Sequence, residues 1–256
     1  MAKWGFNLNG GEFRDALFLR YGWNPQGLPS ECACGSKFNV EHSQQCPRGG
    51  FIIQRHDEVR DVLRDCLNET KCSDIWGETP LMSLSEHQRQ FLSGRYATSN
   101  VEEGARLDLS ARGFWGRRQR AFFDVRVYNP NAPSYSNQSP KDLYRRFEQE
   151  KKRKYNGRVL EVEQGSFTPL VFSNSGGSGP ECTKFLRRLS EMMADRRRER
   201  QSTVMGWLRT RLSFSLLRSS IICLRGCRIS KKHALAVREA DFELARASSH
   251  FEGETV

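Results

Sequence analysis

Four residues in the N-terminal part of the chain have the types and spacing of a zinc site. Cys32, Cys34, His42 and Cys46 fall within fifteen residues. Three thiolates and one imidazole can complete a tetrahedral zinc shell with no open position, which is typical of a structural site. Few hydrophobic residues lie in segment 29–50, so a fold there would need the metal. The one-residue gap between the first two cysteines is tighter than usual, and unrelated surface cysteines are the alternative.

A second set of candidates lies on a predicted β-hairpin. Residues 105–109 and 121–127 alternate apolar and polar side chains, and the loop between them contains glycines and arginines. If the hairpin is symmetric about position 116, paired residue numbers add to 232, which places Asp108 opposite Asp124 on the same face. Like charges in that position are destabilising, so the pattern predicts a cation between them. Solvent-facing charges on a half-exposed sheet are the alternative.

These two carboxylates, with a backbone carbonyl such as that of Val125, would make a hard-oxygen site suited to Mg²⁺ or Mn²⁺. An ion of this kind lowers the pKa of a bound water and neutralises charge on a phosphodiester. Arg126 follows Asp124 by two residues and is expected on the same face, and Glu78 is a further acid on a predicted strand. The order of these residues is similar to the motif of PD-(D/E)XK nucleases.

The charge of the chain favours a polyanionic partner. The formal net charge is +11 and the sequence pI is about 9.5, which suits nucleic acid or an anionic membrane surface. No run of about 18 apolar residues is present, and the most apolar segment, 212–227, is interrupted by Arg218 and Arg225. The N-terminus lacks the pattern of a secretory signal, so we expect the eight cysteines to be metal ligands or reduced thiols.

The periodicity of the chain predicts an α/β fold. Apolar residues at helical spacing are typical of residues 11–21, 51–67, 141–164, 181–198 and 204–224. Short strands are expected at 75–83, in the hairpin and at 167–173, and residues 84–103 are polar and poorly patterned. This order favours a mixed sheet flanked by helices. The predicted organisation is an N-terminal helical linker (1–28), a zinc knuckle (29–50), a core (51–180), C-terminal helices (181–230) and a disordered tail (231–256).

The helix expected at 141–164 is strongly basic. Lys151 and Tyr155 are four residues apart and therefore share a face, and Arg146 and Arg153 also line the helix. A solvated surface is the alternative interpretation of such a charge run.

The ordered succession CACG, H-x3-C, QRHDEVRD, ETPL, ARLDL, FFDVRVYNP and EKKRKY resembles the C-terminal part of site-specific non-LTR retrotransposon proteins. In those proteins a zinc knuckle and a restriction-like endonuclease follow a reverse transcriptase. The resemblance extends from about Phe13 to Arg228 and implies a restriction-endonuclease-like fold. Two positions depart from the family pattern. Leu107 stands where the motif has proline, and Arg126, which stays protonated, replaces the usual lysine.

The resemblance implies a metal-dependent endonuclease that nicks target DNA for retrotransposition and acts in the nucleus. The implied partners are DNA and an RNA template, the implied cofactors are structural Zn²⁺ and catalytic Mg²⁺ or Mn²⁺, and Lys151 would supply the missing amine. The implied catalytic residues are Asp108, Asp124, Arg126, Lys151 and Glu78. The implied nucleic-acid contacts are Arg55, His56, Arg117, Arg118, Arg146 and Tyr155. The alternatives are a catalytically inactive, zinc-stabilised nucleic-acid-binding remnant and a protein-interaction module that docks through helix 204–224.

Overall fold

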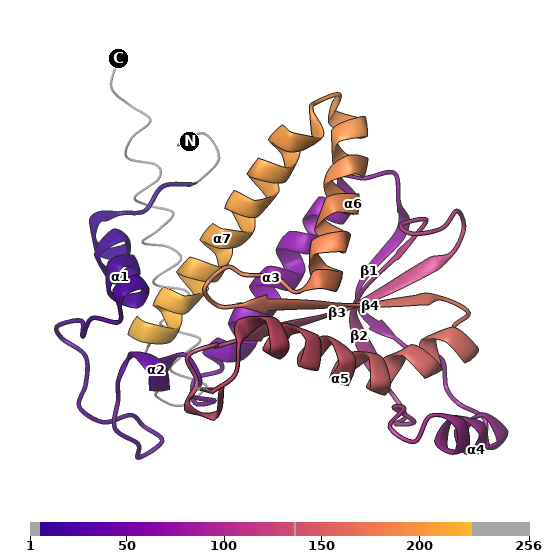
Figure 1. Cartoon of the computed structure of the whole chain (residues 1–256), viewed down its shortest axis with the longest axis horizontal. Coiled ribbons are helices and arrows are strands. Elements are labelled where there is room, and N and C mark those ends of the chain that lie inside the picture. Colours follow the sequence, from indigo (N-terminus) through magenta and orange to yellow (C-terminus); the bar gives the residue numbers. More distant parts are fainter. Residues whose placement is uncertain (1–5, 136, 227–256) are drawn as a thin grey trace.

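A computed structural model describes residues 6–135 and 137–226 and contains one four-stranded sheet between helical layers (Figure 1). The strands follow the order β1-β2-β3-β4 in space. The first two strand pairs are antiparallel, whereas β3 and β4 are parallel because a long helix crosses between them. The protein is therefore a mixed α/β protein, as predicted. The strands are β1 (Ser73–Pro80), β2 (Arg106–Arg112), β3 (Arg120–Tyr128) and β4 (Ser166–Ser173).

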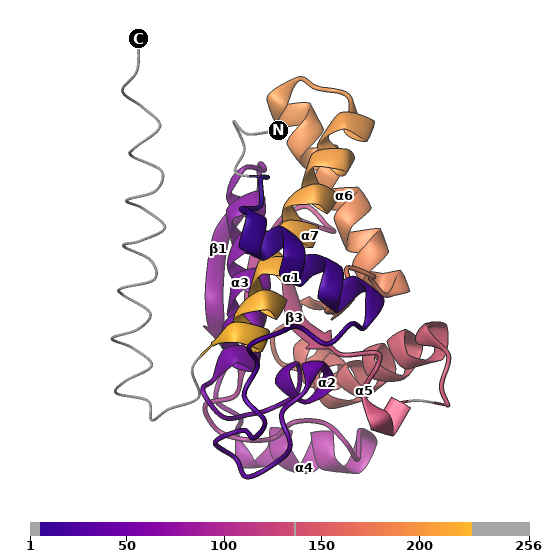
Figure 2. The same cartoon turned by 90° about the vertical axis from the view of Figure 1, so that its left-hand side faces the viewer.

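Helices cover both faces of the sheet. Helices α3, α6 and α7 pack on one face and α5 packs on the other, while α1 crosses α7 at the outer side (Figure 2). The start of α5 is encoded locally, because Ser139 caps the helix and Pro140 occupies its first position. The helices are α1 (Gly10–Tyr21), α2 (Val40–Ser43), α3 (Phe51–Asn68), α4 (Glu86–Arg95), α5 (Pro140–Glu161), α6 (Pro180–Arg197) and α7 (Gln201–Arg225).

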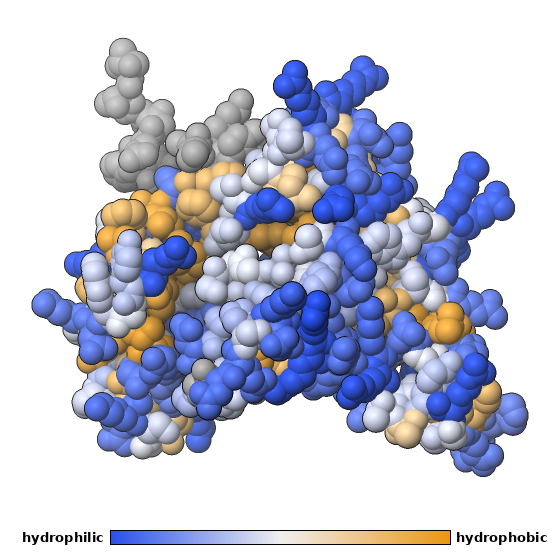
Figure 3. Space-filling view, in the orientation of Figure 1, coloured by the Kyte–Doolittle hydropathy of each residue, from blue (hydrophilic) through white to orange (hydrophobic). Residues whose placement is uncertain are grey.

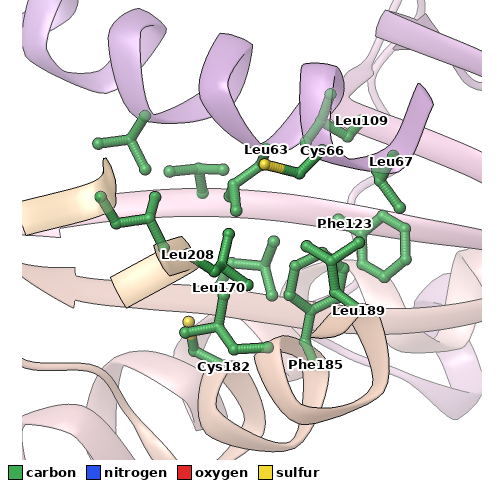
Figure 4. Close-up of a cluster of buried hydrophobic side chains, with 14 of the residues drawn as sticks. Leu63, Cys66, Leu67, Leu109, Phe123, Leu170, Cys182, Phe185, Leu189 and Leu208 are labelled. Carbon is green, nitrogen blue, oxygen red and sulfur yellow. The ribbon is translucent and has the colours of Figure 1, made fainter. Parts of the chain in front are cut away.

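The main hydrophobic core lies between the sheet and the three helices on its first face (Figure 4). Its side chains come from α3, β2, β3, β4, α6 and α7, so this core continues across residue 180, where we expected separate C-terminal helices to begin. Burial of each of its Leu, Val, Phe and Met side chains stabilises the fold by about 1.5–3 kcal/mol. The labelled members are Leu63, Cys66, Leu67, Leu109, Phe123, Leu170, Cys182, Phe185, Leu189 and Leu208.

The β2–β3 hairpin has the predicted register. Leu109 pairs with Phe123 and Arg112 with Arg120, so the residue numbers of each pair add to 232. Counted from the loop, the last pair is Leu109 with Phe123, and Asp108 and Asp124 are the next residues on the two strands. Beyond that point β2 continues to pair with β1, and β3 continues to pair with β4. The two strands therefore lose their direct pairing at the position of the predicted carboxylate pair.

Two helices were not predicted, the four-residue α2 within the knuckle and the longer α4. The segment 84–103 contains α4, which projects from the body of the protein beside the end of α5 (Figure 1). Its N-terminus is a capping box in which Ser85 and Gln88 exchange hydrogen bonds with each other's backbone. This pattern was readable in the sequence.

The remaining expectations concern the membrane and the tail. Among the helices of the described residues, none combines the length and the apolar character that crossing a bilayer requires. The predicted disordered tail, 231–256, lies outside the described residues.

Candidate functional site

The four predicted knuckle residues lie together. Their ligand atoms all fall within 4.8 Å of one another, with Cys32 Sγ 3.6 Å from Cys46 Sγ and Cys34 Sγ 3.4 Å from His42 Nε2. Zinc–sulfur bonds of about 2.3 Å in a tetrahedron require ligand atoms about 3.8 Å apart. The cluster therefore has the dimensions of a zinc shell and could bind zinc.

Local backbone structure brings these ligands together. The turn after Cys32 returns through Gly35, whose φ of 85° is left-handed and suits glycine. Helix α2 then carries His42 and is capped by Asn39. Hydrogen bonds with Ser36 lower the pKa of the Cys34 thiol to about 6. A lowered pKa favours the thiolate, which is the form that binds a metal.

The three predicted acids occupy matching positions on neighbouring strands. Gly77 pairs with Leu109 and Thr79 with Leu107, so Glu78 lies across from Asp108 in the β1–β2 register. Asp108 and Asp124 come directly after the last β2–β3 pair, Leu109 with Phe123, and would be opposite each other if that register continued by one residue. Glu78, Asp108 and Asp124 thus form a row across the sheet, which we call the acid row.

The carboxylate of Asp108 fills the place where strand pairing ends. Its Oδ2 accepts a 2.6 Å hydrogen bond from the backbone N–H of Val125 on β3. The neighbours of Asp108 belong to different clusters, because Leu107 packs in the cluster that contains Tyr155 of α5 and Leu109 packs in the main core. The alternation of side chains is therefore broken at Asp108, and its carboxylate lies in the gap between the strands rather than on one face.

A histidine on α3 completes the surroundings of Asp108. His56 Nε2 lies 3.1 Å from Asp108 Oδ2, and His56 Nδ1 lies 3.1 Å from Asp57 Oδ1. Burial opposes protonation of His56, but the hydrogen bonds and charges of Asp108 and Asp57 outweigh it and raise the pKa of His56 to about 9. His56 is therefore a cation at neutral pH and balances the charge of Asp108.

Asp124 is paired from the opposite layer. Its carboxylate is 7% exposed, and Lys151 Nζ of α5 lies 2.6 Å from its Oδ2. Burial raises the pKa of Asp124, the Lys151 ammonium lowers it, and the charge of Asp108 raises it again. The two aspartates are close enough to affect each other, but their cationic partners come from different faces. The prediction that both carboxylates lie on one face of a regular ladder is therefore wrong, because pairing ends there.

The other two predicted catalytic residues have partners of their own. Arg126 stacks over the Phe147 ring at 3.8 Å and pairs with Glu150 at 3.0 Å. Glu78 has a φ of 50°, is half exposed and pairs with Arg60 of α3. Each of these two charged groups therefore has its ion-pair partner outside the aspartate pair.

The predicted nucleic-acid contacts divide into exposed and buried residues, apart from His56, which is partly buried and pairs with Asp108. Arg117, Arg118 and Arg146 are exposed, the first two in the β2–β3 loop and the third on α5. Arg55 is 2% exposed and Tyr155 is 8% exposed, because Arg55 bonds to the knuckle and Tyr155 packs against Phe167. Both side chains make contacts inside the protein, so the prediction that they contact nucleic acid is wrong.

The surface separates polar and apolar regions. Hydrophilic side chains cover α5 at the lower centre of the view, whereas apolar side chains gather near α1 and α7 at the left (Figure 3). Exposed aromatic residues of the N-terminal segment include Phe13, Tyr21 and Trp23.

Sequence spacing had not related His56 to Asp108, which is 52 residues away. Within residues 6–135 and 137–226, the knuckle is the one group of three or more Cys, His, Asp or Glu ligands close enough to hold an ion. Comparison with known proteins finds no matching family model and no matching curated sequence.

Proposed function

We propose that this protein is a metal-dependent endonuclease module that nicks DNA. The observation that carries the proposal is the acid row with a lysine beside it: Asp108 and Asp124 directly follow the last β2–β3 pair, and Lys151 Nζ lies 2.6 Å from the buried Asp124. A carboxylate at 7% exposure needs a cation. Because that cation is the ammonium of a movable side chain, a metal ion can take its place beside the carboxylate.

Carboxylate oxygens are the donors that a hard divalent cation prefers, but the three acids do not now lie within ligand distance of one another, so binding would have to draw them together. Asp108 and Asp124 would hold it, and Glu78 would join them if it exchanged its ion pair with Arg60. A bound Mg²⁺ or Mn²⁺ would supply a water of lowered pKa and neutralise charge on the phosphate. Lys151, displaced from Asp124, would orient that water or hold its proton. Arg126 cannot act as a base, since arginine stays protonated, and would stabilise charge that develops on the phosphate.

The rest of the molecule supplies a polyanion-binding surface. The net charge is +11, and the exposed Arg117 and Arg118 lie in the β2–β3 loop while the exposed Arg146 lies on α5, the helix that also carries Lys151. Contacts of this kind go to phosphates and give an affinity that falls steeply with salt. The restriction-endonuclease-like fold, the retrotransposon origin and the RNA template belong to this proposal through the sequence resemblance.

A second candidate function is a nucleic-acid-binding remnant without catalysis. It is favoured by the ion pairs themselves, because His56 and Lys151 already balance both aspartates without any metal. In this case the acid row is a structural feature of the sheet. Calorimetric titration with Mn²⁺ separates the two candidates, since the remnant has no binding there.

A plasmid-nicking assay tests the proposal. We expect wild type to convert supercoiled DNA to the open-circular form in Mg²⁺ or Mn²⁺, and Asp124→Asn to lose this activity. The matched control is Asp195→Asn, an exposed aspartate on α6, which should nick like wild type. If wild type and Asp124→Asn nick at the same rate, or neither nicks, the enzymatic proposal is wrong.

A further inference from the structure

Two consecutive residues of α3 connect the knuckle to the acid row. Arg55 Nη1 donates to Gln44 Oε1 at 3.0 Å, and its Nη2 donates to the Gln44 backbone carbonyl at 3.1 Å. The next residue, His56, lies 3.1 Å from Asp108. One turn of one helix therefore contacts both candidate metal sites.

Gln44 is the centre of this connection on the knuckle side. It is 4% exposed and lies between the ligands His42 and Cys46. Its Nε2 donates to the Ser220 carbonyl of α7 at 3.0 Å, and Asn174 after β4 donates to its Oε1 at 3.4 Å. The ligands on each side of Gln44 fix its place, so these contacts depend on the folded state of the knuckle.

Because Arg55 is buried, its contact with Gln44 requires the folded knuckle. Its side chain is 2% exposed, and no carboxylate among the described residues pairs with it. Burying a guanidinium against neutral partners is costly, so the state depends on the two oxygen acceptors of Gln44, to which Cys223 Sγ of α7 adds one weaker acceptor at 3.9 Å. If the knuckle opened, water would replace those acceptors at the guanidinium.

The start of α3 has little stability of its own. Gly50 is its N-cap, with a left-handed φ of 73°, and it offers no side-chain hydrogen bond to the helix. The first turn also lacks an acidic residue that would complement the helix dipole. Four residues, 47–50, separate Cys46 from the helix, so the knuckle is the structure nearest to this end in sequence, and α7 packs against the same end in space.

We propose that Arg55 is a positioning residue through which the folded zinc knuckle fixes the first turns of α3 and thereby the place of His56 against Asp108. The proposal rests on the proposed function, because it treats Asp108 as part of a divalent-ion site. The knuckle then organises the acid row in addition to any contact it makes with nucleic acid.

The test compares two lysine substitutions on the same helix. Arg55→Lys keeps the charge but loses the two-pronged contact with Gln44, whereas Arg64→Lys changes a half-exposed position that pairs with Asp61. We expect Arg55→Lys to retain its zinc, to bind Mn²⁺ about tenfold more weakly by electron paramagnetic resonance, and to shift the ring ¹⁵N resonances of His56. Arg64→Lys should match wild type in all three. Wild-type Mn²⁺ affinity together with unchanged His56 resonances in Arg55→Lys would overturn the proposal.

The two proposals fail differently. If wild type binds no Mn²⁺ at the acid row, the proposed function fails, while the His56 resonances still decide whether Arg55 positions that ring. If Arg55→Lys does not fold, Gln44→Ala takes its place with Gln45→Ala as control, since both leave the four ligands intact. Gln44→Ala with wild-type Mn²⁺ affinity and wild-type His56 resonances would refute the inference in the same way.

Discussion

Removing the ammonium beside Asp124 should destabilise the protein. Lys151→Met keeps most of the side-chain stem but deletes the charge that lies 2.6 Å from Asp124 Oδ2. Loss of one partner from a buried pair costs about 3–5 kcal/mol. Lys151 is 23% exposed, so water can compensate in part. We therefore expect the free energy of unfolding to fall by about 2 kcal/mol, below the fully buried range.

A double-mutant cycle isolates this interaction. Asp124→Asn removes the charge that Lys151 balances, so the double variant should recover part of the loss, with a coupling energy of about 2 kcal/mol. The assay is urea unfolding of the four proteins in metal-free buffer. Thermal melts give a second readout, since 1 kcal/mol shifts the Tm of a domain of this size by about 2–4 °C.

A surface pair on the same helix provides the control. Lys152 is 40% exposed and lies 3.1 Å from Glu181, so Lys152→Met should cost no more than about 1 kcal/mol. The reasoning is refuted if the effects of Lys151→Met and Asp124→Asn are additive, or if Lys151→Met costs no more than Lys152→Met. Either result would mean that the ion pair does not balance a desolvated carboxylate.

Three further predictions concern the knuckle, the base of α4 and the alkaline stability of the core. Cobalt in place of zinc should give the sulfur-to-metal absorption of a tetrahedral thiolate site, and Cys46→Ser should weaken that absorption; an unchanged spectrum would remove Cys46 from the shell. Arg158 is fully buried and donates to the carbonyls of Met82 and Asn100, so Arg158→Met should lower the free energy of unfolding by about 3 kcal/mol in urea, and a loss below about 1 kcal/mol would contradict this. Burial raises the pKa of Cys66 from 9.0 to about 12. The unfolded thiol therefore loses its proton first, and stability present below pH 9 falls by about 1.4 kcal/mol per pH unit as the pH rises toward 12. Cys66→Ala should show a shallower decline in urea unfolding above pH 9, and equal slopes would count against this assignment.

Local patterns were sufficient to predict much of the fold. The alternating runs around the β2–β3 loop determine a hairpin, and a hairpin with a symmetric loop has one register, which is why the predicted pairing holds from Arg112–Arg120 to Leu109–Phe123. The end of that pairing before Asp108 was not predicted. The α4 helix was overlooked because its hydrophobic face is weak. The capping box of Ser85 and Gln88 was the stronger signal there.

The features that spacing could not predict are tertiary. The parallel pairing of β3 with β4 depends on how α5, which connects these two strands, packs on the sheet. The contact of His56 with Asp108 joins residues from a helix and a strand far apart in sequence. Arg55 has the composition of a nucleic-acid contact but is buried by α7 and the knuckle, which lie on either side of it in sequence. Residue types therefore indicated the chemistry, whereas the partners came from packing.

The proposed function requires Asp108 and Asp124 to share one divalent ion. Crystals grown in Mn²⁺ test it directly by anomalous diffraction. We predict a single anomalous peak bound by both carboxylates, with Lys151 Nζ moved away from Asp124 Oδ2. No peak at these residues, with Lys151 still paired to Asp124, would contradict the proposed function.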